Sequence, residues 1–292
     1  MITVRLKGGM GNQMFQYAFG RQLATQLSTD LQLDLTALLD RNRGKDFVYR
    51  NYDLDIFHVQ PRFALNPEML RSFYKIKSSL VTKFCRKLVE RGHKVIKEPH
   101  FHVDQQLLDQ PQNNALYDGW WQSGKYFEGV ADTIRQEFQF KHPLLPASES
   151  LMQQIKGSNA VCLNVRRTDF LKVDNLNTTN KDYFIKAAKY ISERVESPHF
   201  FIFSDDIAWC EGNLELDQPT TFVHHDVKGI KFGNYMRLMK ACKHFIIPNS
   251  SFAWWAVWLN EYSDKIVIAP KNWFNDPQFD TSDLVPEDWV RM

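Results

Sequence analysis

The sequence predicts an α/β protein with two βαβ-type domains, and three patterns in its 292 residues carry that prediction. Residues 2–35 change from a strand period to a helix period and back, which is the order of a βαβ unit. Four short apolar runs recur in the second half, as expected of parallel strands that are buried on both faces. A segment with two prolines lies between the halves.

The first βαβ unit begins near the amino terminus. Apolar and polar residues alternate in 2–7, which indicates a strand. The stretch GGMGNQMFQYA follows at 8–18, and apolar residues then recur every fourth position on one stripe of a helix: Phe15, Phe19, Leu23 and Leu27. Residues 30–35 alternate again. A strand, a helix and a strand in this order predict a parallel sheet.

The second half repeats the strand signal. Its apolar runs are AVCLNV, HFFIFS, HFII and KIVIA, at 160–165, 199–204, 244–247 and 265–269. Helical patterns separate them at 183–195 and 234–242. The polar, proline-containing segment 141–150 is the predicted linker. The expected domains are therefore residues 1–145 and 146–292.

Composition narrows the class of protein. Lys and Arg number 36 against 34 Asp and Glu, a net charge of +2, so the overall charge gives no reason to expect a nucleic-acid partner. The four cysteines lie far apart, without the spacing of a zinc site, and fit reduced thiols. No run approaches the roughly 20 apolar residues of a membrane span. We expect a cytoplasmic protein without a transmembrane segment.

Residues 71–98 mix apolar and basic side chains in an amphipathic helical pattern. Two interpretations stay open. An ordinary helix with a solvated charged face has this pattern, and so has a helix that lies on a membrane surface. The first is favoured, and peripheral membrane contact is the alternative.

Polar residues directly after the buried strands are the candidates for function, because ligands of parallel sheets bind at the carboxyl ends of strands. Arg166 and Arg167 follow the run 160–165 and offer fixed cations for phosphate oxygens. The alternative is a structural ion pair with Asp169. Two arginines for one nearby acid should leave one cation for a ligand.

Two more sets follow other strands. Ser204, Asp205 and Asp206 can accept hydrogen bonds from a ribose or a base, although an acid at this place more often caps the next helix. The sequence PNSSF at 248–252 starts an apolar helix and suits an anion. An ordinary N-cap accounts for one of its polar residues and leaves the others for a ligand.

The glycine-rich stretch suggests close approach of backbone to a phosphate. Against the dinucleotide fingerprint GxGxxG, residues 9–14 read GMGNQM, so Met14 replaces the third glycine and a hydride-transfer cofactor is disfavoured. The P-loop pattern is absent as well. What remains is a phosphate-approaching loop of Gly9, Gly11, Asn12 and Gln13. A nucleoside diphosphate in a cleft between two domains fits this arrangement.

Together the motifs resemble the α-1,2-fucosyltransferases of glycosyltransferase family 11. The likeness includes GGMGNQMFQYA, NVRRTD at 164–169, FSDD at 203–206 and PNSSFAWWAVWL at 248–259, in the expected order over nearly the whole chain. The resemblance implies a GT-B-like fold, with two Rossmann-like domains that face each other across a cleft. It also implies inverting, metal-independent transfer of fucose from GDP-fucose to the 2-hydroxyl of a terminal galactose in a glycan acceptor.

The motifs and the resemblance together give a candidate site without a metal or another cofactor. The expected donor-binding residues are Gly9, Gly11, Asn12, Gln13, Asn164, Arg166, Arg167, Ser204, Asp205, Asp206, Asn249, Ser250, Ser251 and Phe252. The expected catalytic residues are Arg166, Asp169 and Asp174. Asn164 departs from the family, which usually has a histidine there, and an amide cannot shuttle a proton at neutral pH. The alternatives are a transferase for another nucleotide sugar and a non-catalytic sugar-nucleotide-binding protein.

Inversion needs one base on the face opposite the leaving group. Asp169 and Asp174 both follow the arginine pair. If Asp169 orients an arginine, Asp174 is left for the acceptor hydroxyl, and more distant fucosyltransferases have an acid at that spacing. A sugar cation that is well formed before attack would need no strong base.

Other polar groups have simpler interpretations. Asp53 and Asp55 form a DxD, the pair that holds a divalent cation in metal-dependent glycosyltransferases. They alternate with apolar residues, which favours a half-exposed strand or turn. The neighbouring His224 and His225 would point apart on a strand, so a shared metal is not expected. The tryptophans at 254, 255 and 258 fit a core better than a sugar platform.

Overall fold

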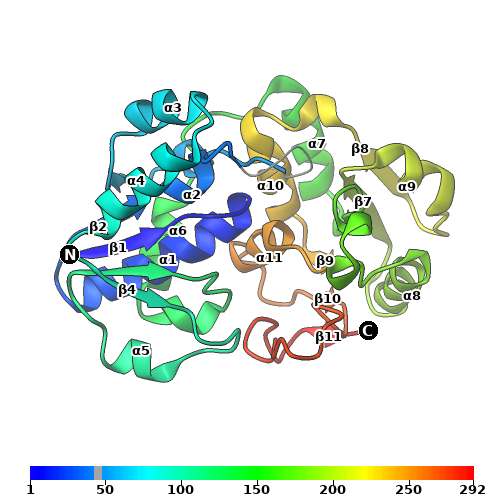
Figure 1. The fold of residues 1–292 in the computed structure, drawn as a ribbon. Coiled ribbons are helices and arrows are strands. Elements are labelled where there is room, and N and C mark those ends of the chain that lie inside the picture. Colours follow the sequence, from blue (N-terminus) through cyan, green and yellow to red (C-terminus); the bar gives the residue numbers. More distant parts are fainter. Residues whose placement is uncertain (43–47) are drawn as a thin grey trace. The chain divides into compact units, whose positions relative to one another are not determined.

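The computed structural model describes residues 1–42 and 48–292 and divides them into two compact units, Met1–Lys141 and His142–Met292. Each unit is built on one parallel β-sheet with helices packed against it (Figure 1). The prediction of an α/β protein with two Rossmann-like domains is confirmed. The expected linker is wrong in its second half, because residues 146–150 begin helix α7 (Pro146–Lys156) with a proline in its first turn.

The sheet of the first unit has the strand order β3-β2-β1-β5-β4, and all neighbours are parallel. Its strands are β1 (Ile2–Arg5), β2 (Leu31–Asp34), β3 (Arg62–Phe63), β4 (Lys94–Lys97) and β5 (Ala115–Asp118). Helix α1 (Met10–Gln26) connects β1 to β2 and confirms the predicted βαβ unit. The central strand β1 is buried along its whole length. Strands β3, β4 and β5 were not predicted from the sequence.

The other helices of the first unit are short. They are α2 (Thr36–Leu39), α3 (Pro67–Lys75), α4 (Ser79–Glu90), α5 (Gln105–Asp109) and α6 (Ala131–Glu137), with 3₁₀ turns η1 (Leu54–Ile56) and η2 (Gly124–Val130). The single helical pattern expected over 71–98 is wrong. The chain turns in a left-handed conformation at Lys77, between α3 and α4, and at Gly92, before β4.

The sheet of the second unit has the order β11-β10-β9-β6-β7-β8, again with parallel neighbours. Its strands are β6 (Asn159–Val165), β7 (Pro198–Ser204), β8 (Thr220–Val223), β9 (His244–Ile246), β10 (Val267–Ala269) and β11 (Val290–Arg291). The four apolar runs are confirmed as β6, β7, β9 and β10. The chain runs outward from β6 to β8 and then returns to place β9 on the other side of β6. That reversal is a topological switch point between β6 and β9.

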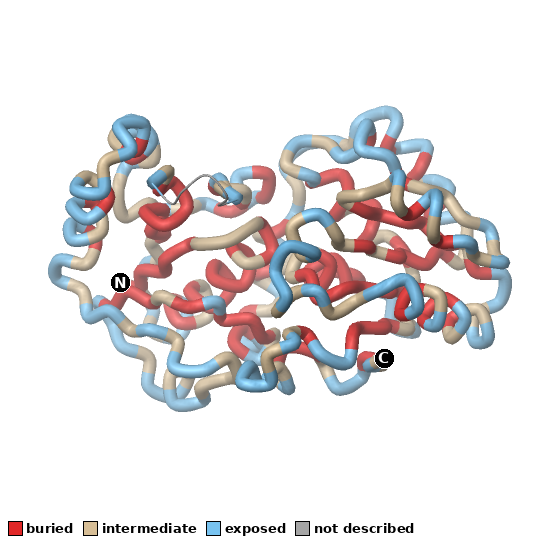
Figure 2. The backbone as a smooth tube through the Cα atoms, turned by 45° about the vertical axis from the view of Figure 1, so that its right-hand side comes forward, coloured by how far each residue is buried: buried red, intermediate tan, exposed pale blue. Residues whose placement is uncertain are grey.

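Helices α8 (Lys181–Ser192), α9 (Ile207–Asn213), α10 (Gly233–Lys240) and α11 (Ser251–Trp258) complete the second unit, with 3₁₀ turns η3 (Phe170–Lys172), η4 (Asp174–Leu176), η5 (His225–Val227) and η6 (Ile230–Phe232). Strands β6, β7, β9 and β10 and helix α11 form the buried interior, while the outer turns of the helices are exposed (Figure 2). Trp254 and Trp255 are almost wholly buried, which confirms the core interpretation for these two tryptophans, whereas Trp258 is half-buried.

Candidate functional site

The register of β6 and β7 brings the arginine pair beside acids. Val165 at the end of β6 pairs with Ser204 at the end of β7. The next residues, Arg166 and Asp205, therefore lie side by side. The Arg166 Nη1 lies 3.2 Å from Asp205 Oδ2, and its Nη2 lies 2.6 Å from Asp169 Oδ1. The Arg166 side chain is 27% exposed. It is therefore held by two carboxylates and still accessible to solvent.

Arg167 is held in a similar way. Its Nε lies 3.4 Å from Asp206 Oδ2, and its guanidinium stacks 3.7 Å above the ring of Trp209. The backbone N–H of Arg167 donates to Asp205 Oδ1 at 2.9 Å. The expectation that only Asp169 competes for the two arginines is wrong, because the parallel neighbour β7 supplies two further acids. Both cations are oriented by carboxylates.

The other residues at these strand ends have structural partners. Asp206 caps α9 by accepting from the Trp209 N–H at 3.2 Å, which confirms the helix-cap interpretation for this acid. The Ser204 hydroxyl accepts from the Asp206 N–H at 2.9 Å. The Asn164 amide donates to the Phe203 carbonyl at 3.1 Å and so links β6 to β7.

The start of α11 lies at the carboxyl end of β9, beside the switch point. Ser250 is the N-cap, and its hydroxyl accepts from the Ala253 N–H at 3.5 Å. The predicted N-cap thus accounts for one polar residue of this cluster. Ser251 and Phe252 form the half-buried first turn. The helix directs its N-terminal partial positive charge toward this edge of the sheet.

Asn249 connects the start of α11 to two loops. Its Nδ2 donates to the carbonyls of Leu176, at 3.0 Å, and Trp273, at 2.9 Å. The side chain is 3% exposed, and its Oδ1 has no hydrogen-bond partner among the residues that the structure describes. A buried acceptor in this state is suited to an N–H or O–H donor of a ligand.

Asp174 lies in the loop that these contacts hold. The Asn275 amide donates to the carbonyls of Asp174 and Asn177, and Asn249 holds Leu176. Asp174 itself is exposed. The loop that follows the arginine pair is therefore tied to the switch-point edge, and it carries a solvated carboxylate there. Sequence reasoning missed Asn275, because about a hundred residues separate it from its partners.

The glycine-rich loop of the first unit has its own constraints. Gly8 has φ +78°, and a Cβ there would lie 2.3 Å from the Asn12 Nδ2, so only glycine fits. Gly9 is the N-cap of α1, and Gly11 lies in its first turn. The Asn12 Oδ1 accepts from the Gln122 amide at 2.6 Å. This loop packs closely against its own helix.

Gln13 is fully buried and uses its amide within the first unit. Its Nε2 donates to the carbonyls of Gly8, at 3.1 Å, and Asn51, at 2.8 Å, and its Oε1 accepts from the Asp53 N–H at 2.9 Å. These bonds hold the segment 51–53 against the loop. The Gln13 side chain is therefore occupied within the first unit. Contacts of this loop with a nucleotide-sugar donor are expected from its backbone and from Asn12.

A carboxylate cluster surrounds Arg5 at the end of β1, and sequence reasoning did not find it. The guanidinium contacts Asp34 at 2.7 Å, Glu90 at 2.9 Å and Asp118 at 2.9 Å. Burial opposes the Arg5 charge, but these carboxylates prevail and raise its pKa. Burial likewise opposes the Asp118 carboxylate, but Lys7 and Arg5 prevail and lower the pKa of that group.

Comparison with known proteins gives the family. The model of Glycosyl transferase family 11 matches residues 58–292. The chain belongs to glycosyltransferase family 11. An alpha-1,2-colitosyltransferase of Escherichia coli is 32% identical over all of this chain and 99% of that protein. The O-antigen biosynthesis glycosyltransferase WbnK of Escherichia coli is 28% identical over 98% of this chain and 99% of that protein.

The resemblance that the motifs predicted is thus confirmed, and this family 11 member is a glycosyltransferase. A solved structure of the NodZ alpha-1,6-fucosyltransferase, co-crystallised with GDP, aligns with 88% of this chain and 91% of that chain. The identity there is 15% and the TM-score 0.48. Among residues 1–42 and 48–292, no helix combines the length and the apolar character that crossing a bilayer requires.

The DxD of this family 11 member forms a turn. Asp53 begins the 3₁₀ turn η1 and is half-buried, while Asp55 is exposed and its apolar neighbours are buried. The half-exposed turn is confirmed. The two neighbouring histidines have different partners: the His225 Nε2 lies 2.8 Å from the Ser204 carbonyl, and the His224 Nε2 lies 3.4 Å from Glu211 Oε1. Within the described parts of the chain, no group of three or more His, Cys, Asp or Glu side chains is placed to hold a metal ion.

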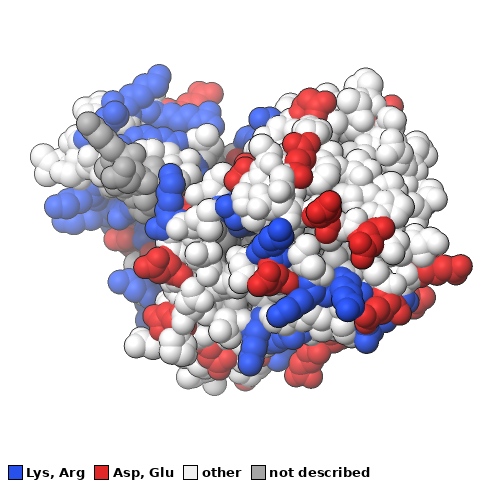
Figure 3. Space-filling view, turned by 90° about the vertical axis from the view of Figure 1, so that its right-hand side faces the viewer, with Lys and Arg blue, Asp and Glu red and all other residues white. Residues whose placement is uncertain are grey.

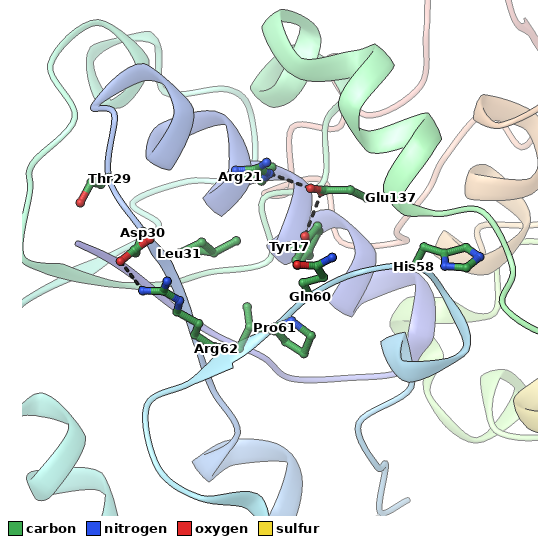
Figure 4. Close-up of a pocket in the computed structure, with 11 residues that line it drawn as sticks. Tyr17, Arg21, Thr29, Asp30, Leu31, His58, Gln60, Pro61, Arg62 and Glu137 are labelled. Carbon is green, nitrogen blue, oxygen red and sulfur yellow. Dashed lines mark hydrogen bonds and ion pairs between the residues drawn. The ribbon is translucent and has the colours of Figure 1, made fainter.

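A cavity of about 360 Å³ opens in the first unit, at the amino ends of β2 and β3 (Figure 4). Tyr17 donates to Glu137 at 2.9 Å inside it, and Arg21 contacts the same carboxylate at 3.0 Å. Burial and the Glu137 charge raise the pKa of the Tyr17 phenol. None of these residues was predicted. Within the first unit, the cavity lies at the amino ends of strands, whereas the glycine-rich loop follows the carboxyl end of β1.

Proposed function

We propose that this enzyme transfers fucose from GDP-fucose to the 2-hydroxyl of a terminal galactose, with inversion and without a metal ion. One observation supports the proposal most: in a family 11 chain, the arginine pair stands at the carboxyl end of β6, and the start of α11 stands at the carboxyl end of the neighbouring β9. A switch point with these groups is where an α/β sheet binds an anionic nucleotide.

The chemistry requires charge stabilisation on the leaving group. When the bond between the anomeric carbon and the phosphate oxygen breaks, the diphosphate gains negative charge, and preorganised donors lower the barrier. A guanidinium has five N–H groups, so the contacts of Arg166 with Asp169 and Asp205 leave donors for phosphate oxygens. The two carboxylates fix the guanidinium plane before the donor arrives.

The rest of the nucleotide has candidate partners at the same edge. The orphan Oδ1 of Asn249 can accept from a ribose hydroxyl or a guanine N–H. The half-buried Asn164 lies one position before the end of β6.

For the base we propose Asp174, with Asp169 as the residue that positions Arg166. Asp169 lies 2.6 Å from a guanidinium nitrogen, and a proton on it would break that ion pair. Asp174 is exposed on a loop that Asn249 and Asn275 hold at the switch-point edge. It is therefore available to take the proton of an acceptor hydroxyl.

The kinetics of two variants distinguish Asp174 from Asp169 as the general base. Asp174→Asn should lower kcat about 10²- to 10⁴-fold, the usual contribution of general-base catalysis, and should remove the acid limb of the kcat profile. Asp169→Asn should weaken donor affinity more than it changes the shape of the pH profile. The reverse pattern would assign the base to Asp169.

A colitosyl nucleotide is the second candidate for the sugar donor, because a relative named alpha-1,2-colitosyltransferase is 32% identical to this chain. Colitose is fucose without its 3-hydroxyl, so a colitosyl and a fucosyl donor present nearly the same surface. The two candidates differ by one hydrogen-bonding group. A site built to bind that hydroxyl discriminates strongly against the analogue without it.

The deciding experiment incubates the purified chain with GDP-fucose, or with GDP-colitose, and lactose, with and without EDTA. We expect an α-1,2-linked product by NMR, faster turnover of the fucosyl donor, no effect of EDTA, and inhibition by GDP but not by UDP. Faster turnover of GDP-colitose would make the protein a colitosyltransferase. Strict dependence on added metal would contradict the proposed charge stabilisation by arginines.

A further inference from the structure

The outer face of α4 carries three large apolar side chains that are exposed. Leu80, Phe84 and Leu88 are 74%, 61% and 42% exposed. They lie four residues apart, so they form one stripe about 12 Å long on the helix. Ile76, which ends α3 before the left-handed turn at Lys77, is also exposed, at 65%. A helix of a globular protein normally directs such a stripe to the core.

A different face of α4 packs against the core of the first unit. Thr82, Cys85 and Val89 are the buried residues of α4. The helix therefore has two apolar stripes, one toward the unit and one away from it. Figure 2 shows the same division in α3 and α4, with the exposed colour on their outer turns. Folding accounts for the inner stripe only.

Basic side chains accompany the outer stripe. Lys83 and Lys87 are exposed and lie beside it on the helix surface. Residues 71–97 contain nine Lys and Arg and a single acid, Glu90, whose carboxylate accepts from Arg5. On the second unit the signs are mixed, and Figure 3 shows Lys and Arg lying among Asp and Glu there. The positive charge of 71–97 is thus a local feature of a chain whose net charge is only +2.

We propose that the exposed side chains of residues 71–91, here named the α3–α4 surface, dock on an anionic phospholipid bilayer. Helices on a membrane insert apolar side chains to the boundary of headgroups and acyl chains, and their Lys and Arg contact anionic headgroups. Each basic residue near such a surface strengthens binding roughly fivefold. The stripe and its flanking cations supply both contributions from one helix face.

Other occupants match only one of the two features. A second copy of the chain would cover the apolar stripe but would bring two strongly basic faces together. A nucleic acid would attract the lysines but would leave Leu80 and Phe84 against a charged, hydrated backbone. An anionic bilayer complements both the stripe and the charge. This inference is independent of the donor and acceptor proposed above.

The test is flotation of the purified full-length chain with lipid vesicles. We expect it to bind vesicles of equimolar phosphatidylcholine and phosphatidylglycerol, to release them at high salt, and to ignore vesicles of phosphatidylcholine alone. Lys83→Glu with Lys87→Glu should weaken binding at least about 25-fold, from two lost attractions. Leu80→Gln with Phe84→Gln and Leu88→Gln should abolish it. All five positions are exposed, so thermal unfolding should stay unchanged.

Matched variants in the second unit control for charge and polarity. Lys186→Glu with Lys189→Glu makes the same charge change on exposed positions of α8 and should bind vesicles as the wild type does. Ile230→Gln changes an apolar residue that is 66% exposed and should also have no effect. The melting temperature should equal that of the wild type for all these variants.

Insertion has a direct readout. The four cysteines of the chain are buried, so Phe84→Cys gives a single exposed thiol for an environment-sensitive fluorophore. Its emission should shift to the blue on anionic vesicles only. Equal binding to neutral vesicles, binding that survives the triple glutamine variant, or an unshifted probe would overturn the proposal. A dimer that the triple variant dissolves, without vesicle binding, would assign the surface to a second copy.

Discussion

The two units place an arginine at the end of their central strand, but at different depths. Arg5 is the last residue of β1, contacts three carboxylates, and has a side chain that is 8% exposed. Arg166 is the first residue after β6, contacts two carboxylates, and is 27% exposed. A shift of one position relative to the strand end separates a buried cluster from an accessible one.

The difference teaches how an ion pair is assigned to stability or to function. Around Arg5 the carboxylates come from β2, β5 and α4, so the cation joins three elements of the unit. Removal of the cation would leave the buried carboxylate of Asp34 charged and desolvated. Around Arg166 the acids stand at the edge of the sheet, where water can replace a lost partner. The first cluster should affect folding, and the second should affect a ligand.

The largest effect should follow from Arg5→Ala. The substitution leaves Asp34, which is buried, without its cation, and it should lower the free energy of unfolding by about 3–5 kcal/mol. Thermal unfolding should shift by roughly 10 °C, and hydrogen exchange should quicken in β1 and β2. The control is Arg62→Ala, whose exposed pair with Asp30 should contribute about 0–1 kcal/mol. Equal effects of the two variants would contradict a structural role for the Arg5 cluster.

Arg166→Ala should instead act on turnover. Loss of one preorganised donor typically lowers kcat about 10²- to 10³-fold, or roughly 3–4 kcal/mol in the barrier. The melting temperature should change little. Arg194→Ala removes an exposed arginine of the same unit, paired with Glu193, and should leave kcat unchanged. An Arg166→Ala enzyme with normal kcat would remove this residue from the site.

Ser250→Ala tests the helix start. Loss of an N-cap should lower the free energy of unfolding by about 1 kcal/mol, and turnover should also fall because the start of α11 is proposed to face the diphosphate. Asn66→Ala removes the cap of α3 in the first unit, where the side chain accepts from Glu68 and Met69. That control should have a similar effect on stability and none on kcat. Equal kcat values for both variants would separate α11 from the donor site.

The smallest effect should be a pH dependence of the second unit. Burial and the nearby Lys243 lower the pKa of His244 below its usual 6.5. Because the folded pKa is depressed, this contribution to stability is complete above 6.5 and is lost as the pH falls through the folded pKa. His244→Asn keeps an acceptor for the Ile266 N–H and removes the titrating ring. Its melting temperature should fall less on acidification than that of the wild type.

The sequence by itself determined the elements whose signal is local. The buried strands of the second unit read as apolar runs because both of their faces are covered. The order of strand, glycine-rich turn and helix at the start predicted a βαβ unit, and the four ordered motifs predicted the family. The N-cap at Ser250 and the cap at Asp206 were readable because a cap bonds within three residues of itself.

Only the tertiary structure decided which residues meet across the sheets. Asp205 reaches Arg166 because β7 lies beside β6 in register, and Asn275 reaches Asp174 across about a hundred residues of chain. Strand order also set the switch point between β6 and β9. Periodicity indicates that a side chain is apolar or charged, but not whether a neighbour covers it. The inner and outer stripes of α4 therefore looked alike in the sequence, and packing separated them.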